Sequence, residues 1–250
     1  MHILLTNDDG YNALGIQTLY RILKSQTKHE ISIVAPEGQR SATGHSITLF
    51  QPLFLLEYNL EEQQKGYAVS GTPSDCVKLA IQGGLIAKPD LLISGINQGQ
   101  NLGTDIFYSG TVSAAMEGAL LGIPSLALSL ASYDFINFEA AATYMAEQLE
   151  FIVQHHRDGL MNINFPGKPQ SEWRGVKVTK LGKAVYENVF ERRVDPHGRT
   201  YFWQCGNLTQ DLEKDTDLSA IQEDYISITP IHSDLTDYKR LQSWQTIFSK

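Results

Sequence analysis

The sequence predicts an α/β protein with a mostly parallel β-sheet and helices on both faces of that sheet. Short apolar runs alternate along the chain with segments whose apolar residues recur at helical spacing. The predicted strands are apolar throughout and do not alternate, as expected for strands buried on both faces. With 250 residues, 42% of them hydrophobic and 19% charged, the chain can form one large domain or two small ones.

The elements follow one another in strand–helix order from the start of the chain. Residues 2–6 form the first predicted strand and residues 16–23 the first helix. Further strands are predicted, in order, at 30–36, 67–71, 89–95, 124–130 and 161–166, and further helices at 74–82, 111–122 and 138–156. No repeat, low-complexity segment or flexible linker interrupts the series, which favours a single domain over 1–250.

The pattern changes after Pro166. Pieces with β-type alternation lie between 175 and 205, separated by Gly and Pro turns, and predict a protruding hairpin extension at about 175–210. A tail at 224–250 follows, with a strand at 225–231 and an amphipathic helix at 236–248. The hairpin aromatics are too many for a thin ribbon in water, so they either pack on the main core or form a subunit interface. They are Tyr186, Phe190, Tyr201, Phe202 and Trp203.

The charge balance excludes several classes of function. The formal net charge is −8 and the pI is near 5.3. Binding to a nucleic-acid polymer or to an anionic membrane would need clustered Lys and Arg, so neither is expected as the main role. A small anionic substrate remains possible, because a bound metal ion can reverse the local field.

Cysteine usage and hydropathy indicate the compartment. Cys76 and Cys205 are the two cysteines, and neither lies in a CxxC spacing, so a disulfide framework is not expected. The first residues have no basic flank or signal-type apolar region, and the most apolar stretch, at 118–131, is short and contains Gly122 and Pro124. We therefore expect a cytoplasmic protein without a membrane-spanning segment.

The turn Asn7-Asp8-Asp9-Gly10, directly after the first strand, is the most informative feature. Ligands of open parallel sheets bind beyond the carboxyl ends of strands. Two adjacent carboxylates can converge in a turn, where they repel unless one is protonated or a cation lies between them. Oxygen donors of this kind suit Mg²⁺ or Mn²⁺. Alternatively, the segment is only a turn with good helix-capping residues.

A second polar cluster follows the strand at 89–95. It runs from Asn97 through Asn101 and Asp105 to the helix start at Ser109-Gly110-Thr111. A helix start rich in Ser, Gly and Thr offers N–H groups, hydroxyls and the positive end of the dipole to a phosphate. Capping alone would explain one hydroxyl, but not the density of glycines and amides.

A third cluster, at 36–45, follows the second strand. Arg40 could contact phosphate and Ser41 could ligate a metal ion, or both could be ordinary loop residues.

Five segments, which lie in order along nearly the whole chain, resemble the SurE family of stationary-phase survival proteins. They are ILLTNDDGYNALGI (3–16), RSATGHSIT (40–48), VSGTPSDCV (69–77), SGINQGQNLGTDIFYSGTVSAAMEG (94–118) and TPIHSDLTDY (229–238). The resemblance implies a Rossmann-like sheet and a metal-dependent 5'-nucleotidase acting on nucleoside monophosphates. It also implies a C-terminal part used in dimers or tetramers.

The motif positions of this family imply a set of site residues in this chain. One Mg²⁺ or Mn²⁺ ion per subunit would be held by Asp8, Asp9, Ser41 and Asn97, with Asp8, Asp9 and Asn97 acting in catalysis. The expected substrate or phosphate contacts are Asn7, Arg40, Gly44, Asn101, Ser109, Gly110 and Thr111.

The expected reaction is attack of metal-activated water on the phosphorus of a nucleoside 5'-monophosphate. Nucleoside 3'-monophosphates and short polyphosphate are further candidate substrates. His45, His232 and Asp234 could help to protonate the leaving alcohol or could simply form ordinary hydrogen bonds.

Two rival functions can be considered for the same sequence. A dinucleotide-binding oxidoreductase is disfavoured because GxGxxG is absent after the first strand and an acidic turn would repel a pyrophosphate. A metal-stabilised nucleotide-binding regulatory protein without turnover fits the same residues.

Overall fold

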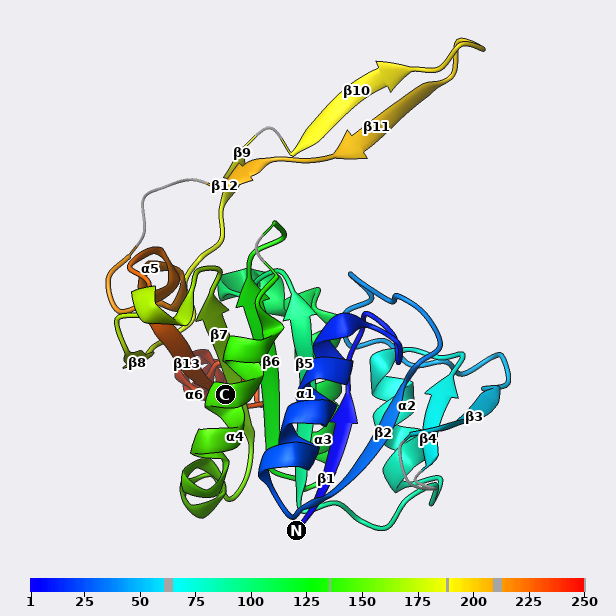
Figure 1. Ribbon diagram of the computed structural model, residues 1–250. Coiled ribbons are helices and arrows are strands. Elements are labelled where there is room, and N and C mark those ends of the chain that lie inside the picture. The colour runs from blue at the N-terminus through cyan, green and yellow to red at the C-terminus, as the bar shows by residue number, and fades with distance from the viewer. Residues whose placement is uncertain (61–64, 135, 188, 209–212, 250) are drawn as a thin grey trace.

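The computed structural model describes residues 1–60, 65–134, 136–187, 189–208 and 213–249, and a twisted central sheet dominates it (Figure 1). Among these residues the sheet has nine strands in the order β3-β4-β2-β1-β5-β6-β7-β13-β8. Their bounds are β1 (His2–Thr6), β2 (Glu30–Pro36), β3 (Leu55–Asn59), β4 (Lys65–Val69), β5 (Leu91–Gln98), β6 (Ser125–Ala131), β7 (Leu160–Pro166), β8 (Val176–Val178) and β13 (Ile226–Ile231). Only the β3–β4 and β7–β13 pairs are antiparallel, so the predicted mostly parallel α/β fold is confirmed.

Helices cover both faces of this sheet. On one face lie α1 (Leu14–Gln26) and α4 (Phe138–His155), and on the other lie α2 (Pro73–Ile81) and α3 (Gly110–Leu120) (Figure 1). Side chains of β1 alternate between the two layers, because successive strand residues point to opposite faces. Ile3 and Leu5 pack in the α1–α4 core, whereas Leu4 packs in the α2–α3 core. Both faces of β1 are therefore covered by apolar side chains, and the polar residues lie at its carboxyl end and in the turn that follows.

Helix α1 approaches the sheet unusually closely at Gly15. A Cβ built on this residue would lie 1.9 Å from the carbonyl oxygen of Ile96 in β5. Only glycine fits this contact without a shift of backbone. The close approach fixes α1 against the strand end that carries Asn97.

Some elements were not expected from sequence. The exposed edge strand β3 is defined by its pairing with β4. Three short helices are too brief to show a periodic pattern: η1 (Gly103–Phe107), η2 (Gln170–Glu172) and α5 (Asp217–Gln222). Residues 176–178, grouped by sequence with the hairpin, form β8 at the edge of the main sheet. The body of the hairpin therefore begins further along the chain.

The protruding hairpin consists of β10 (Phe190–Val194) and β11 (Thr200–Gln204), and the short pair β9 (Tyr186–Glu187) and β12 (Asn207–Leu208) forms its root. Phe190 is 64% exposed and Trp203 58% exposed, so the alternative that the aromatics pack on the main core of this chain is wrong for those of β10 and β11. Positions 188, 209–210 and 250 of the predicted hairpin extension and tail lie outside the described residues.

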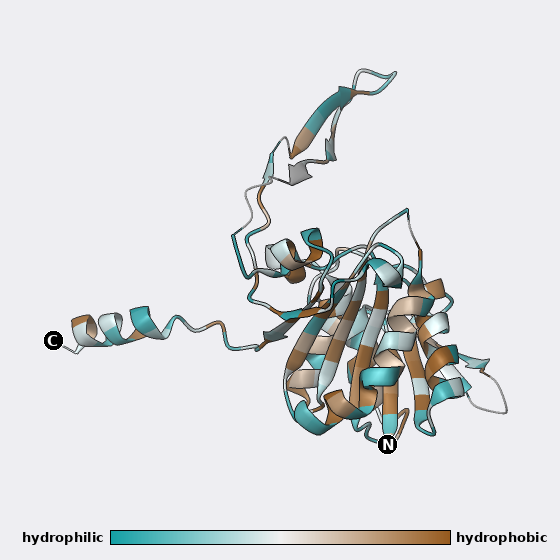
Figure 2. Ribbon diagram, turned by 60° about the vertical axis from the view of Figure 1, so that its left-hand side comes forward, coloured by the Kyte–Doolittle hydropathy of each residue, from teal (hydrophilic) through white to brown (hydrophobic). Residues whose placement is uncertain are grey.

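Helix α6 (Tyr238–Phe248) buries none of its residues and stands apart from the body (Figure 2). None of the helices in the described part of the chain is long and apolar enough to cross a membrane.

Candidate active site

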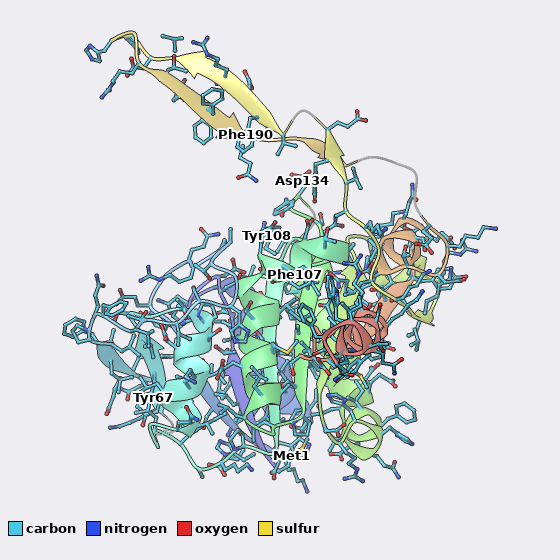
Figure 3. The ribbon with its side chains drawn as sticks, turned by 180° about the vertical axis from the view of Figure 1, so that it is seen from behind. Met1, Tyr67, Phe107, Tyr108, Asp134 and Phe190 are labelled. Atoms are coloured by element: carbon cyan, nitrogen blue, oxygen red, sulfur yellow. The ribbon has the colours of Figure 1, made fainter. Side chains whose placement is uncertain are left out.

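The strand order changes direction between β1 and β5, and this opens a crevice at their carboxyl ends. The chain leaves β1 through α1 toward β2, and it leaves β5 through α3 toward β6, over the opposite face. Ligands of open α/β sheets bind at such a point. A cavity of about 580 Å³ lies there, and its lining includes Asp8, Asp9, Asn97 and Tyr108. Tyr108 lies at the end of the main sheet opposite Met1 (Figure 3).

The turn after β1 is closed by its own asparagine. Asn7 Nδ2 donates to the carbonyl oxygen of Gly10 at 2.8 Å, and the Gly10 amide donates to Asn7 Oδ1 at 3.2 Å. Gly10 has a φ of +103°, a conformation that side chains rarely adopt. This ring of hydrogen bonds holds the two aspartates at one cavity.

The first turn of α3 packs directly against Asp8. Thr111 Oγ1 donates to Asp8 Oδ1 at 2.5 Å, and both residues are buried. A Cβ built on Gly110 would lie 2.7 Å from the Cβ of Asp8. Because the amino end of a helix carries partial positive charge, α3 also favours the ionised carboxylate.

Burial nevertheless works against ionisation of both aspartates. It raises the pKa of Asp8 from 3.8 to about 6; the hydrogen bond from Thr111 opposes this shift and the charge of Asp9 adds to it. Burial also raises the pKa of Asp9, against a hydrogen bond from the Gln98 amide at 3.4 Å. A cation between the two carboxylates would offset both effects.

The donor atoms of the cavity fit a hard divalent ion. Ser41 and Asn97 line it beside Asp8 and Asp9. The side-chain nitrogen Nδ2 of Asn97 donates to the Gly99 carbonyl at 2.9 Å. The side-chain oxygen of Asn97 is therefore the atom suited to a metal ion. No group of three or more His, Cys, Asp or Glu residues in the described ranges could hold a metal ion. Two carboxylates with neutral oxygens are typical of Mg²⁺ sites rather than of Zn²⁺ sites.

Comparison with known proteins identifies the family. The family model described as "Survival protein SurE" matches residues 3–188. The chain belongs to the SurE family. It is 60% identical over 242 residues to the 5'-nucleotidase SurE of Desulfitobacterium hafniense (strain DSM 10664 / DCB-2), covering 97% of this chain and 95% of that protein.

Other SurE proteins agree in sequence and in fold. The 5'-nucleotidase SurE of Pelotomaculum thermopropionicum is 50% identical over 248 residues, covering 97% of this chain and 93% of that protein. The crystal structure of the SurE protein from Aquifex aeolicus superimposes with a TM-score of 0.85 at 39% identity, covering 99% of each chain. The resemblance stated from sequence is confirmed.

The SurE cavity brings together part of the residue set expected from sequence. The expected residues that line it are Asp8, Asp9, Ser41, Asn97, Asn101 and Ser109.

The other expected residues lie around the cavity without lining it. Asn7 closes the turn, and Gly110 and Thr111 pack on Asp8. Arg40 donates through its guanidinium to the Ser70 carbonyl at 2.8 Å, and the Gly44 amide donates to the Tyr108 carbonyl at 3.0 Å.

None of the candidate proton donors lines this cavity either. His45 contacts Glu117, and Asp234 accepts hydrogen bonds from Thr236 and Tyr238. His232 and His45 line a separate, largely apolar cavity of about 510 Å³.

Tyr133 is a lining residue that sequence reasoning missed. It follows β6 by two residues, and β6 lies beside β5 in the sheet. The sequence analysis looked for polar residues at the carboxyl ends of strands; extending that search to aromatic residues would have found Tyr133 once the strand order was known.

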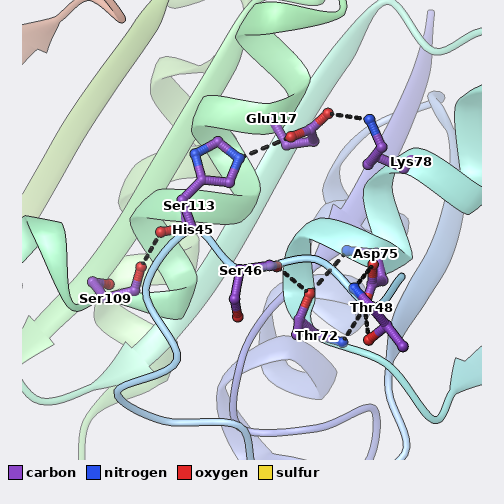
Figure 4. Close-up of polar contacts among 9 residues, drawn as sticks. All are labelled: His45, Ser46, Thr48, Thr72, Asp75, Lys78, Ser109, Ser113 and Glu117. Atoms are coloured by element: carbon purple, nitrogen blue, oxygen red, sulfur yellow. Dashed lines mark hydrogen bonds and ion pairs between the residues drawn. The ribbon is translucent and has the colours of Figure 1, made fainter. Parts of the chain in front are cut away.

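The loop at 37–54, which carries Ser41, has neither helix nor strand and is held by two polar anchors (Figure 4). In the first, the Glu117 carboxylate of α3 lies 2.8 Å from His45 Nε2 and 3.2 Å from Lys78 Nζ. Glu117 is buried, and the hydrogen bond from His45 is the main cause that lowers its pKa.

The second anchor joins the loop to the start of α2. Thr48 donates to Asp75 through its amide at 2.9 Å and through its hydroxyl at 2.6 Å. Thr72 Oγ1 donates to the Ser46 carbonyl at 2.7 Å. Together the anchors set where Ser41 meets the cavity.

We expect Glu117→Gln to lower the free energy of unfolding by about 1–3 kcal/mol, because a buried, hydrogen-bonded charge loses its partners. The pKa of Glu117 in the parent protein lies below its ordinary value of 4.5. The loss of stability should therefore be full above pH 4.5 and should shrink as the pH falls below that value. Urea unfolding at pH 7 and pH 4 measures this.

Glu139→Gln is the matched control. The Glu139 carboxylate contacts Arg21 at 2.7 Å, but both side chains are more than half exposed. The substitution should therefore change the free energy of unfolding by less than about 1 kcal/mol. Equal effects of the two variants would contradict the anchor.

Proposed function

We propose that this chain is a divalent-metal-dependent phosphomonoesterase that hydrolyses nucleoside 5'-monophosphates to nucleoside and phosphate. The observation that carries the proposal is the pair Asp8 and Asp9, adjacent carboxylates with raised pKa values that share one cavity at the β1–β5 crevice. Relatives up to 60% identical over nearly the whole chain are named 5'-nucleotidase SurE, which supports the same reaction here.

One Mg²⁺ or Mn²⁺ ion would be held by Asp8, Asp9, Ser41 and Asn97. Such an ion supplies a Lewis acid for a phosphoryl oxygen and lowers the pKa of water. The hydrogen bond from Thr111 favours the ionised form of Asp8, and Asn7 closes the turn that carries both carboxylates. Ser109 and Asn101, which line the cavity, are the residues proposed to contact phosphate.

Asn101 is well placed for this task because its backbone is fixed. Its amide donates to Asn164 Oδ1 at 2.9 Å, and its carbonyl accepts from Asn162 Nδ2 at 2.8 Å and from Asn164 Nδ2 at 3.0 Å. A residue held by three hydrogen bonds from β7 needs no further ordering. Its side-chain Nδ2 donates to Ser129 Oγ at 2.8 Å and has a second hydrogen to offer a phosphate oxygen.

Phosphate release by chelator-treated protein, with Mg²⁺, Mn²⁺ or no metal added back, tests the proposal. We expect release from nucleoside 5'-monophosphates only when metal is present. Nucleoside 3'-monophosphates and short polyphosphate belong in the same panel. Binding of nucleotide without release under every condition would instead identify a regulatory protein.

We expect Asp8→Asn to lower kcat at least about a hundredfold, because the metal loses a charged ligand. The metal-free variant should nevertheless be more stable than the metal-free parent at pH 7.5, by about 1–3 kcal/mol. The reason is that the pKa of Asp8 is about 6 in the folded protein and 3.8 in the unfolded chain. Ionisation of Asp8 therefore lowers the free energy of unfolding, by an amount that grows as the pH rises from 3.8 to 6.

Thermal unfolding in chelator at pH 7.5 and pH 4.5 measures this difference, which should narrow at the lower pH. Glu139→Gln again serves as the control. A variant that keeps parental turnover, or that loses stability in chelator, would count against the assigned role of Asp8.

Self-association to a dimer or tetramer is also proposed. Trp244 and Phe248 of α6 are 55% and 81% exposed, and the hairpin aromatics are exposed as well. Apolar surface of this kind usually marks an interface. We expect light scattering to give at least twice the mass of one chain; a monomer at micromolar concentration would exclude this.

A further inference from the structure

The cavity is larger than a metal ion and a phosphate need. Cavities of roughly 300–1,000 Å³ accommodate whole small molecules, and this one, at about 580 Å³, is of that size. Besides Asp8 and Asp9, its lining includes Asp105 and two aromatic residues, Tyr108 and Tyr133. A phosphate and a metal ion would therefore leave room for the rest of the substrate.

The ring of Tyr133 lies against the backbone of Gly99, just past the end of β5. A Cβ built on Gly99 would lie 2.6 Å from both Cζ and Oη of Tyr133, so the ring occupies the space that a side chain would fill. Gln98 Nε2 donates to the Tyr133 carbonyl at 2.9 Å and holds the base of the loop. Tyr133 is nevertheless 71% exposed, which leaves ring surface open to the cavity.

The root of the hairpin fixes the neighbouring wall. Tyr186 donates its hydroxyl hydrogen to Asp105, and Thr104 Oγ1 donates to the Ala184 carbonyl at 3.3 Å. The buried carboxylate of Asp217 accepts from the amides of Gly103 at 2.7 Å and Gly182 at 2.8 Å. Helix η1 is therefore joined to the segment 182–186, and together they form a wall of the cavity that Tyr133 also lines.

We propose that Tyr133 is the nucleobase platform of this cavity, on which the base of a nucleoside monophosphate stacks beside the wall that carries Asp105. The inference rests on the proposed function for the phosphate end and adds the residue that recognises the other end. Stacking uses the π-face that every base has, so the platform accepts purines and pyrimidines. It gives a nucleotide an advantage over a sugar phosphate that lacks a base.

The test compares adenosine 5'-monophosphate with ribose 5-phosphate, the same phosphate ester without a base. Tyr133→Ala should lower kcat/KM for the nucleotide about tenfold, mainly through KM, and leave ribose 5-phosphate within about twofold. Tyr133→Phe keeps the ring and should restore the nucleotide value to within about threefold. Phe151→Ala, which truncates an exposed aromatic on α4 away from the cavity, is the control.

Equal loss on both substrates, or no loss on either, would overturn the platform. Calorimetric binding of adenosine 5'-monophosphate with Mn²⁺ separates this result from failure of the proposed function. If the parent protein released no phosphate, the proposed hydrolysis would fail, but a tenfold weaker affinity in Tyr133→Ala would still support the platform. Unchanged affinity would overturn it.

Discussion

Two adjacent carboxylates at the end of β1, one buried and one half-buried, are the central constraint of this molecule. Burial raises the pKa of both carboxyl groups, so their ionisation costs more there than in water. The fold holds them in place with an asparagine ring around the turn and the amino end of α3 packed on Asp8. Such an arrangement stores unfavourable electrostatic energy that a divalent ion would relieve, so it is better explained by ion binding than by stability of the empty protein.

The sheet itself was largely predictable from sequence, because buried parallel strands are continuous apolar runs and their connections are periodic helices. Residues that follow strand ends could also be placed, and Asp8, Asp9 and Asn97 meet in one cavity as expected. The remainder depends on contacts between distant segments. β3 is defined by pairing with β4, and the fit of Gly15 against Ile96 has no local signature.

The direction in which side chains point could not be predicted from the sequence either. Arg40 and Thr111 are residue types that suit phosphate, but the structure turns Arg40 toward the Ser70 carbonyl and Thr111 toward Asp8. Residue type and position along the chain constrain chemistry without fixing orientation. Conversely, Tyr133 lies in an unremarkable stretch of sequence and reaches the cavity only because β6 adjoins β5.

The residues around the cavity differ in how freely they can be replaced during evolution, and the contact between Gly110 and Asp8 is the tightest restriction. Any side chain at position 110 would collide with the carboxylate, and Gly10 allows few replacements at its backbone angle. The exposed loop at Tyr133 carries no such restriction on its side chain. With Tyr133 in its proposed role, related proteins can diverge in which molecules they accept while the acidic residues stay the same, and a change of preference needs no rebuilding of the sheet.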